Sequence, residues 1–169
     1  MGERMATVHL ICGKICSGKT FFCRQLVKET GAIVLSCDER MLAMRPDGLF
    51  GDQHETIAAL AQQELLQESL QLTEKGDSVI LEWGFWTRAD RQKISNFYRE
   101  HGRRFIWHYM AVDDAQWLQN IAHRNEAVRA GKEKAYFVDE ALKAKLERLF
   151  EPPMPEEIDV WHEMRRQEK

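Results

Sequence analysis

The apolar positions of this chain fall into two patterns that alternate along its length. Short continuous apolar runs are typical of parallel strands buried on both faces, whereas apolar residues three or four apart are typical of helices packed on one side. The short runs predict strands at residues 8–12, 32–36, 78–81 and 104–112. The stretches between them predict helices at residues 19–28, 39–44, 52–74 and 87–102, with another from Asp113 through Ile121.

Start and stop signals support these helix boundaries. Thr87 with Asp90, and Asp113 with Gln116, have the three-residue spacing of helix N-terminal capping, and Gly76 follows the long third helix as a stop signal. Strands that alternate with helices imply right-handed crossovers and a parallel sheet. We therefore expect an α/β protein with a three-layer α/β/α arrangement and a mostly parallel sheet of four or five strands.

Composition limits the classes of partner. With 169 residues, 44% of them hydrophobic, the chain is expected to form a single domain over residues 1–169. The net charge of -3 provides no overall basic field that would attract nucleic acid or an anionic membrane. The four cysteines have no zinc-site spacing and favour reduced thiols in a cytoplasmic protein. We expect neither a signal peptide nor a membrane span.

The residues directly after the first predicted strand read GKICSGKT and match the pattern G-x-x-x-x-G-K-[ST]. In this pattern glycines let the backbone fold around an anion, the lysine reaches the outer phosphates and the hydroxyl holds Mg²⁺. The following helix start favours negative charge, so a P-loop NTPase fold that binds a nucleotide is expected. The expected phosphate-binding residues are Gly13, Lys14, Ile15, Cys16, Ser17, Gly18, Lys19 and Thr20, with Lys19 also catalytic and Thr20 on the metal.

Other motifs narrow the class of nucleotide-binding protein. A guanine-reading N-K-x-D motif is absent from the sequence, which argues against a GTPase. The third strand ends in a lone Glu82, and the chain is short for the extra lid domain of hexameric ATPases. A phosphoryl-transfer enzyme that uses ATP and Mg²⁺ remains the favoured class.

The carboxyl ends of the strands supply the candidate acid and base groups, because ligands of open α/β sheets bind there. Asp38 follows the second strand, and we expect it to act as the general base; alternatively, Ser36 or Asp38 caps the short helix that follows. Glu82 follows the third strand and is expected to hold Mg²⁺ or orient the acceptor. Its alternative role is an ion pair with Arg88 or Arg91.

Arginines supply the candidate cations. Arg124 and Arg129 belong to a basic segment, and we expect a helical lid over about residues 122–137 that covers ATP. The alternative is a solvated charged helix face. The Pro-rich segment 151–157 is expected to be irregular and offers an apolar surface for adenine.

The acceptor side is expected at the aromatic and basic residues that follow the third strand. The expected acceptor-binding residues are Glu82, Trp83, Phe85, Arg88 and Arg91. Large rings there can stack on a flat or sugar-like molecule. Aromatic residues at a strand end also serve as core, and the basic residues also fit a solvated helix face.

Taken with GKICSGKT, the segments VLSCDERM, VILEWGFWTRADR, AHRN and LFEPPMPEEIDVW give the chain a resemblance to the P-loop kinase superfamily. It is most similar there to predicted kinases related to 5′-polynucleotide kinase, zeta toxin and chloramphenicol phosphotransferase. The resemblance implies that Asp38 is the general base, that Lys19 and Thr20 are the Walker A lysine and hydroxyl, and that Arg124 and Arg129 are lid arginines.

The sequence departs from the family pattern at two positions, one that concerns metal binding and one that concerns the class of phosphate acceptor. The family pattern D-x-x-F-x-x-R-x-D-R has Glu82 in place of its first Asp, which lengthens the carboxylate by one methylene. Polynucleotide kinases tend to have an arginine three residues after the base, where this chain has Met41 with Arg40 beside it. We therefore expect transfer of the ATP γ-phosphate to a small-molecule hydroxyl. A 5′-hydroxyl polynucleotide kinase and a non-catalytic or slowly hydrolysing ATP-binding module remain alternatives, and the sequence does not indicate the oligomeric state.

Overall fold

The computed structural model describes residues 5–48, 50–132 and 138–163. Its sheet has strand order β2-β3-β1-β4-β5, and every neighbouring pair is parallel. The strands are β1 (Thr7–Cys12), β2 (Ile33–Ser36), β3 (Val79–Glu82), β4 (Arg104–Ala111) and β5 (Val160–Glu163). The prediction of a mostly parallel sheet with four or five strands is confirmed.

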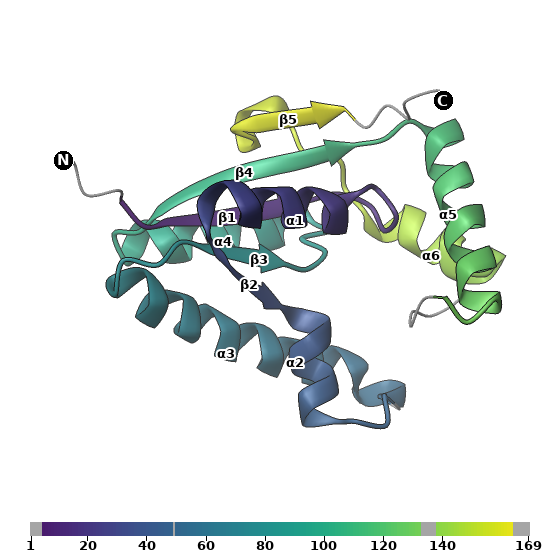
Figure 1. Cartoon of the computed structure of the whole chain (residues 1–169), viewed down its shortest axis with the longest axis horizontal. Coiled ribbons are helices and arrows are strands. Elements are labelled where there is room, and N and C mark those ends of the chain that lie inside the picture. The colour runs from purple at the N-terminus through teal and green to yellow at the C-terminus, as the bar shows by residue number, and fades with distance from the viewer. Residues whose placement is uncertain (1–4, 49, 133–137, 164–169) are drawn as a thin grey trace.

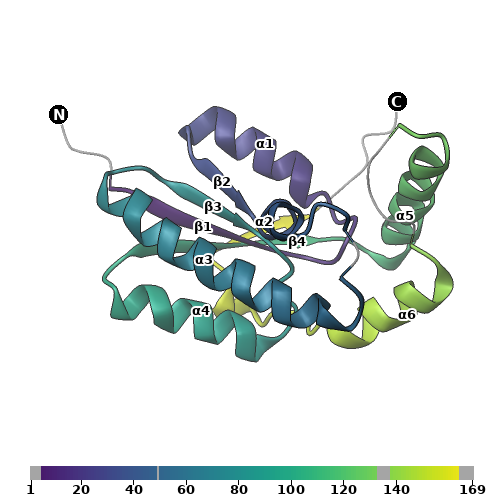
Figure 2. The same ribbon diagram turned by 90° about the horizontal axis from the view of Figure 1, so that it is seen from below.

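Helices cover both faces of this sheet, as Figures 1 and 2 show, with α1 on one face and α3 and α4 on the other. The helices are α1 (Lys19–Thr30), α2 (Cys37–Met44), α3 (His54–Glu74), α4 (Arg88–Glu100), α5 (Asp114–Arg129) and α6 (Glu140–Leu149). Short 3-10 turns form η1 (Gly51–Gln53) and η2 (Pro155–Glu157). The three-layer α/β/α prediction is confirmed, and α5 and α6 lie at the end of the sheet toward which the strands run.

Capping explains where the helices begin and end. The side chain of Thr87 accepts a hydrogen bond from Asp90 N, and the side chain of Asp113 accepts one from Gln116 N, as their spacing predicts. Gly31 ends α1 in the left-handed conformation with φ of 70°, which glycine adopts without steric cost. These local signals set the element boundaries.

The strand β2 is an edge strand, so the prediction that residues 32–36 are buried on both faces is wrong. In the described part of the sheet β2 pairs with β3 alone, and its residues Ile33 and Val34 are 39% and 36% exposed. Leu35 remains buried. An apolar run has the same composition in a central strand and in an edge strand, so the sequence pattern does not separate the two.

The sequence pattern does not predict β5, which forms the opposite edge of the sheet. Trp107 N donates to Asp159 Oδ2 at 2.8 Å and Asp159 N donates to Trp107 O at 3.0 Å, so Asp159 aligns the last strand on β4. The Pro-rich segment 151–157, predicted to be irregular, contains η2 and leads into β5.

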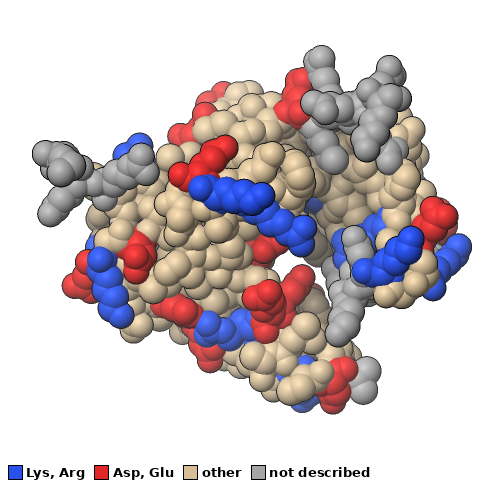
Figure 3. Space-filling model, viewed as in Figure 1, with Lys and Arg blue, Asp and Glu red and all other residues tan. Residues whose placement is uncertain are grey.

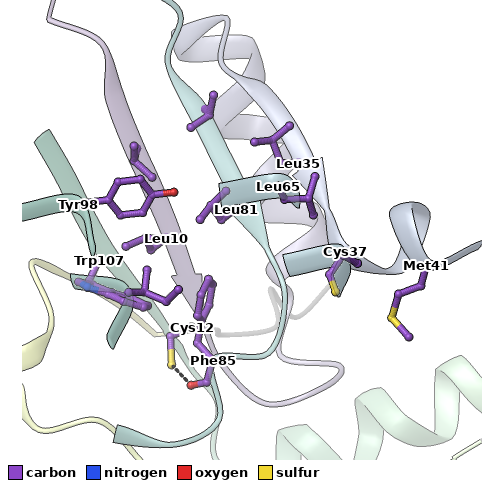
Figure 4. Close-up of a cluster of buried hydrophobic side chains, with 14 of the residues drawn as sticks. Leu10, Cys12, Leu35, Cys37, Met41, Leu65, Leu81, Phe85, Tyr98 and Trp107 are labelled. Atoms are coloured by element: carbon purple, nitrogen blue, oxygen red, sulfur yellow. Dashed lines mark hydrogen bonds between the residues drawn. The ribbon is translucent and has the colours of Figure 1, made fainter. Parts of the chain in front are cut away.

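The main core lies between the sheet and the helices α3 and α4 (Figure 4). Buried side chains from β1 and β3, including Leu10 and Leu81, meet Leu65 of α3 and Tyr98 of α4. A smaller cluster on the other face packs α1 against the sheet. Among the described residues, no helix is long and apolar enough to cross a membrane.

Candidate active site

The GKICSGKT loop connects the end of β1 to the start of α1, as predicted. Its geometry requires both glycines. Gly18 has φ of 92°, and a Cβ on Gly13 would lie 2.6 Å from Ser17 Oγ and 3.1 Å from Met110 O. Only a residue without a side chain fits so closely or adopts such a φ without strain. The loop is therefore wound tightly over the end of the buried strand.

The carbonyl oxygens at the start of the loop are engaged within the loop itself. Gly13 O accepts a hydrogen bond from Lys19 Nζ at 2.8 Å, and Lys14 O accepts one from Ser17 N at 3.2 Å. The hydroxyl of Ser17 is buried and has no hydrogen-bond partner among the described residues.

The next carbonyl oxygens of the loop are held by α5. Ile15 O accepts from Trp117 Nε1 at 2.7 Å, and Cys16 O accepts from Asn120 Nδ2 at 2.8 Å. In a trans peptide the C=O and N–H groups point in opposite directions, so the amide that follows Ile15 points away from α5. This arrangement suits a loop that offers N–H groups to an anion.

Lys14 packs on the same helix. Its ammonium group lies 4.6 Å from the centroid of the Trp117 ring and 3.8 Å from Asp114 Oδ1. Lys14 therefore contributes to docking the loop on α5. Sequence reasoning missed the docking role of Trp117 and Asn120; their three-residue spacing on one helix face is the signal that could have indicated it.

Two predicted metal ligands lie next to each other. Thr20 Oγ1 donates to Glu82 Oε1 at 3.3 Å, which joins the start of α1 to the end of β3. Burial raises the pKa of Glu82, while the bond from Thr20 and the charge of Lys19 lower it. The alternative ion pair of Glu82 with Arg88 or Arg91 is not formed, because both guanidinium groups pair with Glu157.

Lys19 lies among acidic groups from two strand ends. Burial lowers its pKa, and the nearby carboxylates of Glu82 and Asp38 oppose that lowering. Ser36 at the end of β2 lies opposite Glu82 at the end of β3, and Asp38 follows two residues later, so both acidic residues lie at the same edge of the sheet. Glu82 also accepts a hydrogen bond from Thr20, which is the next residue after Lys19. The structure therefore brings together these three residues, which the sequence analysis had assigned to catalysis or metal binding.

Asp38 lies in the first turn of α2, exposed to solvent. The cap of that helix is Ser36, whose Oγ accepts from Glu39 N at 3.3 Å. The capping alternative therefore applies to Ser36 and leaves the carboxylate of Asp38 for another role. Figure 3 shows the molecule hollowed between α2 and the side that carries α5, with acidic side chains along the α2 side. A separate open groove between α3 and α4 contains none of the predicted site residues.

Arg91 and Phe85, predicted to contact the acceptor, are buried. Arg91 is 2% exposed; its Nε donates to Glu157 Oε1 at 3.0 Å, its Nη1 to Phe85 O at 2.8 Å and its Nη2 to Glu151 O at 2.9 Å. Phe85 is 3% exposed and belongs to the main core. The core alternative is correct for Phe85, and the guanidinium of Arg91 ties the C-terminal segment to the loop after β3.

The remaining expected acceptor residues stay nearer the surface. The side chain of Arg88 is 55% exposed and its Nε lies 3.9 Å from Glu157 Oε2. Trp83 is half-buried against the ring of Phe85, with centroids 5.0 Å apart. Trp86 is also half-buried, and its indole would collide with any Cβ on Gly84.

The two expected lid arginines lie on α5, which continues to Arg129. Arg124 Nη1 lies 3.5 Å from Cys16 Sγ, so this residue reaches the phosphate-binding loop. Arg129 is the exposed last residue of the helix. Residues 133–137 of the predicted lid lie outside the described part of the chain.

Both the sequence and the fold of this chain were compared with those of known proteins. A family model described as AAA domain matches residues 8–153. No curated protein matches the sequence significantly. A candidate kinase from Chloroflexus aurantiacus has 19% identity and a TM-score of 0.68, covering 96% of this chain and 87% of that one.

Two further solved structures share the fold. An APS kinase from Mycobacterium tuberculosis, solved with AMPPNP and APS, has 16% identity and a TM-score of 0.65, covering 96% of this chain and 91% of its own. A chain of an RNA repair complex has 14% identity and a TM-score of 0.68, covering 88% of this chain and 45% of its own. At these identities the similarity establishes the fold.

Proposed function

The chain belongs to the AAA domain family and has the fold of P-loop kinases, and from this premise we propose that it is an ATP-dependent phosphotransferase. Its acceptor is proposed to be a hydroxyl group of a small molecule. One observation carries the proposal: Lys19, Glu82 and Asp38 lie beside the loop at the ends of three parallel strands, where Ser36 is paired opposite Glu82 and Glu82 contacts Thr20.

The proposed reaction assigns a separate task to each of these groups. The loop and Lys19 bind the phosphates of ATP. The carboxylate of Asp38 accepts the proton of the acceptor hydroxyl as its oxygen attacks the γ-phosphorus. The bond from that phosphorus to the β–γ bridging oxygen breaks, and ADP leaves with the bond's electron pair. Arg124 and Arg129 are proposed to stabilise the transferring charge.

Thr20 and Glu82 fit Mg²⁺. Both present oxygen atoms, they already meet at 3.3 Å, and Mg²⁺ bound to a nucleotide commonly takes one or two protein ligands besides phosphates and water. The ion would neutralise charge on the β- and γ-phosphates. Because burial raises the pKa of Glu82, its carboxylate gives up its proton at a higher pH than an exposed glutamate.

A small-molecule acceptor agrees with the surroundings of Asp38. Arg40, beside the position where polynucleotide kinases tend to have an arginine, pairs with Glu64 at 3.1 Å and with Glu68. The guanidinium of Arg40 therefore pairs with two carboxylates of α3. The likeness to APS kinase supports a small acceptor, while the likeness to a chain of an RNA repair complex keeps the polynucleotide alternative as an outcome of the test.

The proposal is tested by transfer of labelled γ-phosphate from Mg-ATP to pooled nucleosides, sugars, aminoglycosides, phenicols and 5′-hydroxyl oligonucleotides. Asp38→Asn should reduce transfer at least 100-fold, because general-base catalysis contributes about 10²–10⁴-fold. ATP affinity should stay within about twofold, since Asp38 is not proposed to hold the nucleotide.

Glu39→Gln is the matched control, an exposed carboxylate that follows Asp38 on the same helix, and it should keep transfer. Full transfer by Asp38→Asn would rule out Asp38 as the base. Nucleotide binding with no labelled product from any acceptor would favour the second candidate, an ATP-binding module without transfer. Labelled oligonucleotide alone would establish the polynucleotide alternative.

A further inference from the structure

The loop contains one residue other than glycine in the left-handed conformation, Cys16, with φ of 59°. Residues 14–17 form a turn in which Ser17 N donates to Lys14 O at 3.2 Å, so Cys16 is the third residue of a four-residue turn. A positive φ at that position normally requires glycine or asparagine. A cysteine there is strained and persists only if its surroundings hold it.

Asn120 supplies such a contact. Its Nδ2 donates to Cys16 O at 2.8 Å, and its Oδ1 accepts from Gln116 Nε2, also at 2.8 Å. The bond from Gln116 orients the amide so that its NH₂ group faces the loop. Since Ser17 N donates to Lys14 O, the peptide between Cys16 and Ser17 is bonded at both its oxygen and its nitrogen.

We propose that Asn120 is a positioning residue of the nucleotide site, which holds the strained turn at Cys16 in the conformation that binds the phosphates of ATP. The inference rests on the proposed function. Gln116 supports Asn120 by fixing its amide. In this proposal Asn120 acts through the loop, by its bond to Cys16 O.

The proposal predicts that the effect of Asn120→Ala on ATP affinity depends on whether Cys16→Gly is also present. Asn120→Ala should weaken ATP binding about tenfold, because one net hydrogen bond is worth about that factor in an equilibrium constant. Glycine adopts a positive φ without strain, so Asn120→Ala should weaken binding less than about threefold when Cys16→Gly is already present. A merely structural role of Asn120 would weaken binding equally in both backgrounds.

The measurement is the Kd of Mg-ATP by titration calorimetry for four proteins: the unmodified chain, each single variant and the double variant. Asn96→Ala, an exposed asparagine of α4, controls for the loss of an amide from a helix and should leave Kd unchanged. Circular dichroism verifies folding. If Asn120→Ala does not fold, Gln116→Ala removes only the support and should weaken binding by a smaller factor.

Two results would overturn the inference while leaving the proposed function intact: unchanged affinity in Asn120→Ala, or an equal loss with and without Cys16→Gly. If the unmodified chain binds no ATP, the inference and the proposed function both fail. A loss of affinity that Cys16→Gly suppresses would establish the positioning role.

Discussion

At the scale of single residues, Arg91 is the most heavily bonded charged side chain described above. It joins three parts of the chain, the carbonyl of Phe85, the carbonyl of Glu151 and the carboxylate of Glu157. Phe85 itself has φ of 46°, a strained value for an aromatic residue. The bond from Arg91 therefore holds a strained backbone in place, as Asn120 does at Cys16.

Arg91→Gln should destabilise the protein by about 3–5 kcal/mol, because Glu157 and two carbonyls would lose a buried charged partner. For a chain of this size the Tm should fall by about 10 °C or more, measured by thermal denaturation. Arg99→Gln, an exposed arginine of the same helix, should change Tm by no more than about 2 °C. If Arg91→Gln keeps its Tm and only raises the acceptor KM, Arg91 is an acceptor ligand after all.

Residue roles could be predicted where the partners are close in sequence. The GKICSGKT loop is contiguous, so its glycines, lysine and threonine could be identified from spacing alone. The partners of Arg91 lie at Phe85, Glu151 and Glu157, up to 66 positions away. Nothing local distinguishes this arginine from Arg88, which is why both were expected at the acceptor.

At the scale of elements, three strands are linked by a row of histidines. His9 of β1 is bonded to His108 of β4 at 3.1 Å, and His108 to His162 of β5 at 3.2 Å. Burial lowers the pKa of His108 to about 4, and the two neighbouring imidazoles add to the effect. In each of these two contacts one ring nitrogen donates and the other accepts, and burial is the main reason why the neutral form of His108 is favoured.

This row makes the packing of β4 sensitive to acid. The pKa of His108 is lower in the folded state than the 6.5 of an unfolded chain, so its stabilising contribution is present above about pH 6.5 and is lost as the pH falls toward 4. The loss should be on the order of 3 kcal/mol. The free energy of unfolding, measured by urea denaturation at several pH values, should depend less on pH over this range in His108→Gln. The same measurement on His54→Gln, which replaces an exposed histidine, should show the pH dependence of the unmodified chain. An unchanged slope in His108→Gln would exclude this account.

Element boundaries followed from caps and glycines, but strand positions in the sheet did not. Apolar runs identified β1, β2, β3 and β4, whereas β5 is short and its outward side chains include the exposed Trp161. Its place depends on the bonds of Asp159 to Trp107, a pairing between distant segments. Hydrophobic periodicity carries no information on such pairing.

At the scale of the whole molecule, the candidate site joins separate parts of the fold. Lys19, Glu82 and Asp38 come from the loop, β3 and α2, while α5 holds the loop from the other side. The sequence could indicate that the strand ends meet, because parallel strands end at one edge. It could not indicate how α5 packs on the loop, since those contacts join residues about a hundred positions apart.

A ligand that binds only the folded molecule should stabilise all of these parts together. Mg-ATP at about 100 times its Kd should add about 2.7 kcal/mol and raise Tm by about 5–10 °C. Thermal scans with Mg²⁺ alone provide the baseline. Lys19→Ala should abolish most of the increase, and an equal increase in that variant would place nucleotide binding elsewhere.

The exposed edge at β2 has a practical consequence for anyone who concentrates this protein. An edge strand leaves backbone N–H and C=O groups available to another chain, and apolar side chains such as Ile33 and Val34 strengthen that intermolecular pairing. Aggregation should therefore begin at this edge. Natural proteins often blunt such edges with lysine, and the exposed side chain of Val34 offers a position for one.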